Sequence, residues 1–249
     1  MKIKSIISIL FLSMTFFCNA QKIVSHNNQQ WIQYYNQLKL SEKLTLYSDV
    51  SLRRINNFNQ WSQVTIRTGI GYPLTENLQV VTGFACFNFY NNNKPSRIEF
   101  RPYQEVNTSQ NLCNVAVQHR LRVEARYFRK ISDGVITSQS NFNFRFRYRL
   151  YCGIPLVKLS ASNPDKKLLL NIGDEIFINA GKEIIYNMLD NNRLLLGSTF
   201  QINKYLNISF TYTYQFGQRN SPSTYEHSDI YWLGIIHKLS LKKMTKKTE

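Results

Sequence analysis

The sequence predicts an all-β fold, a transmembrane antiparallel up-and-down β-barrel of about twelve strands. Apolar and polar residues alternate through most of the chain, as in residues 141–152, NFNFRFRYRLYC. This period of two is that of a strand with one apolar and one polar face. The alternating segments run for about ten residues or more, as a tilted strand needs to cross a bilayer, whereas soluble strands most often have about 5–6. Strand length therefore favours a membrane barrel over a secreted soluble sandwich.

The first twenty residues have the order of a cleaved signal peptide. Lys2 and Lys4 precede an apolar stretch at 6–17, and Cys18-Asn19-Ala20 forms a small-x-small cleavage site before Gln21. The stretch is shorter than the roughly 20 residues of a spanning helix. We therefore expect an exported protein with residues 1–20 removed, a single barrel domain over 21–240 and a basic tail over 241–249.

Eleven alternating segments are predicted to be the strands of this domain. They are residues 30–38, 44–53, 61–72, 78–90, 97–109, 113–129, 140–152, 168–178, 192–202, 206–217 and 227–239. The connections alternate between short and longer, as in outer-membrane barrels. An even-numbered barrel with both termini in the periplasm needs one more strand, for which residues 21–28 are the candidate. No later segment has the run of about 18 uncharged apolar residues that a transmembrane helix needs.

The charge of the chain is strongly positive, at a formal +16. Removing residues 1–20 takes away two lysines and no acids, which leaves +14. A basic chain with interleaved aromatic residues resembles a nucleic-acid binder, but export argues against that partner. The partners we expect are outer-membrane lipid and small anionic solutes.

One polar face, shared by neighbouring strands, collects most of the charged residues. Its members are Arg53, Arg67, Glu99, Arg101, Glu105, Arg120, Arg122, Glu124, Arg126, Arg145, Arg147, Arg149, Glu175 and Arg193. This face must line the lumen, because an arginine at the lipid midplane costs about 2–4 kcal/mol. Ten arginines against four glutamates suit a narrow pore whose lining attracts anions. The alternative is a structural barrel whose side-chain-filled lumen is braced by Arg–Glu networks.

Signals for an enzyme are weak in this sequence. It contains neither Gly-x-Ser-x-Gly nor His-Glu-x-x-His, so we expect no catalytic residues, no metal site and no cofactor. A lipid-acting barrel enzyme is a further alternative, in which His119 on the apolar face would be the base. The adjacent predicted strands at 97–109 and 140–152 present no outward serine as its nucleophile. The sequence therefore favours a protein that is not an enzyme.

Three cysteines remain after residue 20: Cys86, Cys113 and Cys152. Cys113 and Cys152 begin and end the two strands of one predicted hairpin, on its apolar face. In an oxidising compartment they would come within disulfide range if the register sets them opposite each other. A register change of two residues would separate them.

Several motifs together resemble one known family. They are HRLRVEAR at 119–126, FRFRYRL at 144–150, DEIFIN at 174–179, NNRLLLG at 191–197, and the W…L…L…R run of residues 31–53. The chain is similar over residues 27–239 to the domain-of-unknown-function family numbered 2490. The resemblance implies a barrel in the outer membrane of a Gram-negative bacterium, with an uncharacterised role and no known catalytic residues. Unlike many outer-membrane barrels, the last strand ends on Leu239 and not on an aromatic residue.

Overall fold

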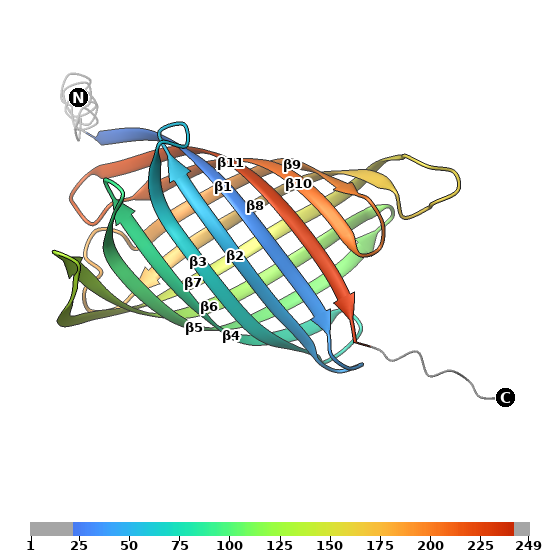
Figure 1. Ribbon diagram of the computed structural model, residues 1–249, viewed down its shortest axis with the longest axis horizontal. Coiled ribbons are helices and arrows are strands. Elements are labelled where there is room, and N and C mark those ends of the chain that lie inside the picture. The colour runs from blue at the N-terminus through green and yellow to red at the C-terminus, as the bar shows by residue number, and fades with distance from the viewer. Residues whose placement is uncertain (1–21, 242–249) are drawn as a thin grey trace, which may run out of the picture.

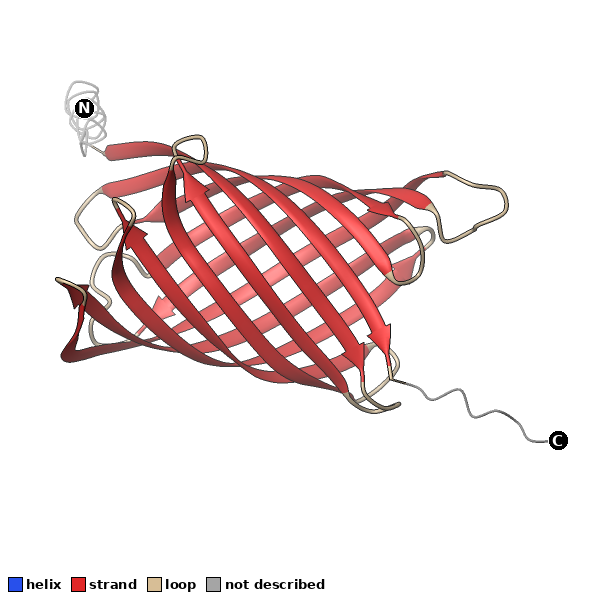
Figure 2. Cartoon of the chain, viewed as in Figure 1, coloured by secondary structure: helices blue, strands red, loops and turns tan. Residues whose placement is uncertain are grey.

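The computed structural model describes residues 22–241, and these residues form one closed β-barrel (Figures 1 and 2). The all-β barrel prediction is therefore confirmed, with eleven strands instead of about twelve. Within the described residues, no helix has the length and apolar composition needed to cross a membrane. The predicted signal peptide, residues 1–20, and residues 242–249 of the predicted basic tail lie outside the described residues.

The strands follow one another around the barrel in chain order. Their bounds are β1 Ile23–Lys39, β2 Thr45–Ile55, β3 Gln60–Pro73, β4 Leu78–Asn91, β5 Lys94–Leu112, β6 Val115–Ser132, β7 Val135–Lys158, β8 Lys167–Ala180, β9 Leu189–Gln201, β10 Leu206–Gln218 and β11 Thr224–Ser240. All neighbours are antiparallel except β1 and β11, which close the barrel as a parallel pair from Ile23↔Thr224 to Lys39↔Ser240.

The parallel closure corrects two predictions about the start of the chain. Residues 21–28 do not form a separate strand, because residues from Ile23 onward already belong to β1. The polar and aromatic side chains of Asn27, Gln29 and Trp31 continue one inward-facing row without a turn. The two ends of the described chain therefore lie at opposite rims of the barrel and not at the same one (Figure 1).

Some connections predicted to be longer loops are tight hairpins. β6 and β7 continue to a two-residue turn at Asp133-Gly134, where φ is +51° and +78°. Asn92-Asn93 joins β4 and β5 in the same way, with φ of +49° and +64°. Positive φ at both central residues is the requirement of a type I′ turn, and Asp-Gly satisfies it well. Strand extension thus removes much of the expected alternation between short and long connections.

The two faces of the barrel wall differ in polarity as the alternation predicts. Apolar side chains such as those of Ile66 and Leu121 are 58% and 57% exposed on the outer surface. The inner face carries buried polar groups, among them Glu99 and Thr213, each 0% exposed. The barrel is therefore apolar outside and polar inside, the reverse of a soluble core.

Glycines on the inner face of β3 and β4 make room for a tyrosine. Gly69 and Gly83 are register partners, and the ring of Tyr103 lies against both positions. The Tyr103 hydroxyl donates a hydrogen bond to the carbonyl oxygen of Thr68 at 3.2 Å. This ring consequently lies along the wall, which leaves the middle of the lumen to the arginines.

Gly83→Ala is expected to destabilise the barrel by about 1–3 kcal/mol, because its Cβ would overlap Tyr103 and the Thr68 carbonyl. Gly153→Ala is the matched control, since the nearest atom to its Cβ is Asn171 Oδ1 at 3.7 Å. Urea unfolding of the two variants in the same detergent measures the difference. Equal midpoints for the two variants would show that the Tyr103 packing is unimportant.

Candidate lumenal site

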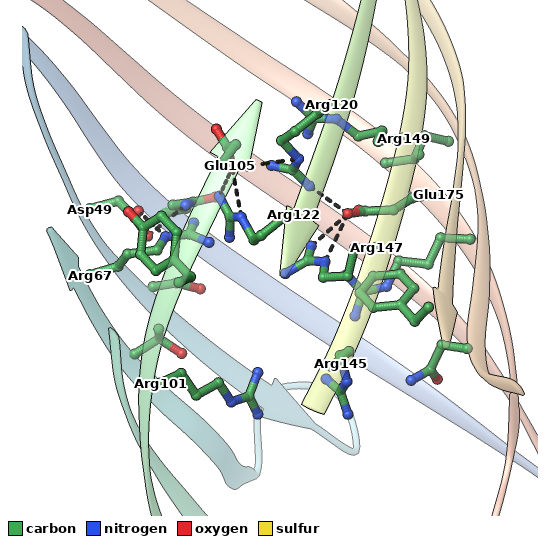
Figure 3. Close-up of a pocket in the computed structure, with 18 of the residues that line it drawn as sticks. Asp49, Arg67, Arg101, Glu105, Arg120, Arg122, Arg145, Arg147, Arg149 and Glu175 are labelled. Carbon is green, nitrogen blue, oxygen red and sulfur yellow. Dashed lines mark hydrogen bonds and ion pairs between the residues drawn. The ribbon is translucent and has the colours of Figure 1, made fainter. Parts of the chain in front are cut away.

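A single cavity of about 1260 Å³ occupies the lumen and is lined by residues from all eleven strands. Its lining includes Thr75 in the β3–β4 turn at one rim and Arg219 in the β10–β11 turn at the other. The charged residues of its walls come mainly from β5, β6, β7 and β8 (Figure 3). The candidate site is therefore the interior of the barrel, with its charge concentrated on one side of the wall.

Glu99 on β5 is the most enclosed carboxylate of the lumen, at 0% exposure. Arg97 lies 2.9 Å from it and Arg126 lies 3.1 Å from it. Arg101 forms a third ion pair with the same carboxylate and stacks on the ring of Phe87, 3.7 Å from guanidinium carbon to ring centroid. One carboxylate thus compensates three arginines from β5 and β6.

A second set of ion pairs links side chains of β5, β6, β7 and β8 along the inner face of the wall. Arg147 donates to Glu175 at 2.7 Å (Figure 3) and to Glu124 at 2.6 Å, so it links two carboxylates. Arg120 also pairs with Glu175, and Arg101 reaches Glu124 at 3.3 Å. Because each carboxylate serves two or more arginines, the network is continuous and charge-assisted throughout.

Two further carboxylates, Glu105 and Asp49, form ion pairs on the neighbouring part of the wall. Glu105 accepts from Arg122 Nε at 2.6 Å and lies 3.9 Å from Arg120. Asp49 on β2 accepts from Arg67 Nε at 2.6 Å (Figure 3). Asp49 and Arg67 both point into the lumen, as the other charged side chains of the site do.

Three carboxylates of this site were missed by the sequence prediction: Asp49, Asp190 and Glu226. Asp49 lies on the inward parity of the segment predicted at 44–53, so the alternation alone could have identified it. Asp190, which pairs with Arg145 at 2.7 Å, lies in β9 two residues before the predicted start of that strand, and Glu226 lies in β11 one residue before its predicted start. Their inward positions depend on strand boundaries that the sequence does not mark.

All fourteen predicted lumenal residues lie on the inner face: Arg53, Arg67, Glu99, Arg101, Glu105, Arg120, Arg122, Glu124, Arg126, Arg145, Arg147, Arg149, Glu175 and Arg193. Eleven arginines of the strands face inward, against seven inward carboxylates, of which Glu226 pairs with Arg219 of a turn. Within residues 22–241, Arg53, Arg149 and Arg193 have no carboxylate at ion-pair distance. The surplus of positive charge is therefore located on particular side chains.

The predicted disulfide is not formed in the structure. Cys113 lies in the β5–β6 turn with φ of +54°, and the register partner of Cys152 is Val117. Four residues of a strand, at about 3.3 Å each, exceed the Cα separation that a disulfide spans. Both thiols are free, and the register separates them too far for this pairing.

His119 faces outward, as its parity predicts. Its Nδ1 lies 2.8 Å from the Tyr148 hydroxyl, and its cross-strand neighbours are Thr108 and Leu150. This hydrogen bond gives the polar imidazole a partner on an otherwise apolar surface. In the described part of the chain, no three His, Cys, Asp or Glu side chains are grouped so as to hold a metal ion.

The fold and the site together define a class: a closed β-barrel with an apolar exterior and a lumen crossed by arginine–carboxylate pairs. The family model of proteins of unknown function DUF2490 matches residues 28–226. The chain belongs to this family, as its motifs predict.

No curated protein matches the chain. Among solved structures, it is similar to the siderophore receptor PirA from Pseudomonas aeruginosa, with 9% identity and a TM-score of 0.34 over 74% of this chain and 35% of the receptor. A mutant of the ferric enterobactin receptor PfeA from the same organism matches with 10% identity and a TM-score of 0.32, over 74% and 36%. The chain thus spans about a third of the length of these receptors.

Proposed function

We propose that this protein is an outer-membrane barrel whose narrow lumen passes small anionic solutes. The observation that carries the proposal is one cavity, lined from rim to rim, in which arginines outnumber carboxylates eleven to seven along the strands. Rings of basic side chains are the usual lining of anion-selective pores. The apolar outer surface supports the membrane location, since only a closed barrel satisfies all strand hydrogen bonds in lipid.

The size of the barrel sets the scale of the solute. Barrels of about eight strands are filled by side chains, whereas those of 16–18 strands leave an aqueous channel. Eleven strands lie between these limits, and the side chains of Arg147 and Glu124 are only 10% and 3% exposed. The proposed pathway therefore suits ions and small acids, and it excludes bulky solutes.

Purified protein in a planar lipid bilayer is expected to conduct weakly and to prefer chloride over potassium. The measurement is the reversal potential in a tenfold KCl gradient. Arg149→Glu should shift this potential toward cation preference, because Arg149 lines the cavity and forms no ion pair in the described chain. Lys204→Glu, an equal charge change in the exposed β9–β10 turn, is the control. Absence of conductance, or cation preference in the unmodified protein, would refute the pore.

A structural barrel is the second candidate, and the ion-pair network favours it. Glu99, Glu124 and Glu175 are each 3% exposed or less, and each contacts at least two arginines. Such a network fills and braces the lumen even if nothing crosses it. The conductance measurement separates the candidates, because a purely structural lumen carries no current.

A further inference from the structure

Two arginines that form no ion pair in the described chain contact one tryptophan of the lumen. The guanidinium carbon of Arg53 lies 3.7 Å from the ring centroid of Trp31, its register partner on β1. The guanidinium carbon of Arg193, on β9, lies 5.0 Å from the ring of the same tryptophan. The two guanidinium groups are therefore within reach of one small bridging ligand, although their strands are not neighbours in the barrel.

The protein partners of both guanidinium groups are neutral. Arg53 donates to Gln63 Oε1 at 3.4 Å, and Arg193 Nε donates to Gln215 Oε1 at 2.6 Å. Arg193 also stacks on Phe177, with 4.5 Å between its guanidinium carbon and the ring centroid. Aromatic stacking orients a guanidinium plane but adds no negative charge to it. Neither guanidinium group forms an ion pair in the described chain, although Glu175 on β8 is the register partner of Arg193.

One donor in this cluster has no acceptor. The Nε of Arg53 is buried and makes no hydrogen bond within the described structure. An unpaired buried donor of a charged group costs free energy, so a retained one calls for an explanation. The same arginine lines the lumenal cavity together with Trp31 and Arg193, so a ligand in the cavity can reach it.

We infer that Arg53 and Arg193, over Trp31, form a binding site for one doubly charged oxyanion, with phosphate-type chemistry. A phosphate group matches two guanidinium forks in charge and in the bidentate geometry of its oxygens. Trp31 is 2% exposed, so its neighbours hold fixed the ring on which both guanidinium groups lie. The inference deepens the proposed function, because it assigns a solute class and a resting position to the anion pathway.

Calorimetric titration of the folded barrel in a zwitterionic detergent with inorganic phosphate tests the site. The unmodified protein is expected to bind one phosphate per chain, and Arg53→Gln and Arg193→Gln should each weaken that binding at least tenfold. Phosphate should also change the tryptophan fluorescence, and Trp31→Phe should abolish this change while Trp61 and Trp232 remain. Circular dichroism establishes that each variant is folded before it is titrated.

The control is Lys238→Gln, which removes one positive charge from another part of the cavity lining. It should leave phosphate affinity within about twofold of the unmodified protein, if the binding is local. No saturable binding, or an equal loss in the Lys238 variant, would overturn the site. Anion-selective conductance without phosphate binding would refute this site alone, whereas phosphate binding without conductance would refute only the pore.

Discussion

Glu99→Gln is expected to destabilise the barrel by about 3–5 kcal/mol, the usual cost of removing one partner from a buried ion pair. The substitution conserves the size of the side chain but removes the only negative charge that Arg97, Arg101 and Arg126 share on this side of the lumen. Three arginines would then repel one another without the carboxylate that lies between them. Reversible urea unfolding in lipid vesicles, followed by tryptophan fluorescence, measures the free energy of unfolding.

Glu76→Gln is the matched control for this experiment. Glu76 lies exposed in the β3–β4 turn, so its substitution should change the free energy of unfolding by less than about 0.5 kcal/mol. If the Glu99 variant is as stable as the Glu76 variant, the lumenal ion pairs do not brace the barrel. The structural candidate for its function would then lose its main support.

Ile66→Arg is expected to prevent stable insertion into lipid, at a cost of about 2–4 kcal/mol if the side chain lies near the bilayer midplane. Ile66 is 58% exposed on the outer surface of β3, between strands whose outward residues are also apolar. In water the same substitution would be nearly neutral or would improve solubility. The yield of folded barrel in lipid vesicles, read by heat-modifiable migration in electrophoresis, gives the result.

Ile185→Arg controls for the change of side chain. Ile185 is 72% exposed but lies in the β8–β9 connection, beyond the ends of the strands. Its arginine variant should insert as well as the unmodified protein. Equal insertion of both variants would contradict the proposal that the apolar belt faces lipid.

The sequence predicts which face of the barrel wall each residue takes better than it predicts how many strands close the barrel. A period of two decides which side of a strand each residue faces, so Arg147 and Ile66 could be assigned to opposite faces without a structure. Strand number is different, because it depended on where the first strand begins. The alternation through Asn27 and Gln29 is continuous with β1, and the assumed even parity divided that strand in two.

The sequence predicts which residues face the lumen, but it does not predict which of them contact one another. Parity places Arg53 and Arg193 in the lumen, yet it cannot show that strands β2 and β9 bring them to the same tryptophan. That meeting depends on the curvature of the closed wall and on the length of two side chains. Likewise, the pairing of Arg145 with Asp190 depends on a register between β7 and β9 that passes through β8. Contacts across a lumen are properties of the barrel and not of any one segment.

The parallel seam between β1 and β11 separates Ile23 from Ser240 by the full height of the wall, whereas the first and last strands of an even antiparallel barrel begin and end at one rim. If the barrel spans a membrane, Ile23 and Ser240 open into different compartments, and a protease added on one side can cut only one of them. A circular permutation that joins these two residues would need a linker as long as the barrel is tall. A reporter fused at each end would therefore give opposite signals, and a single protein would map both sides of the membrane.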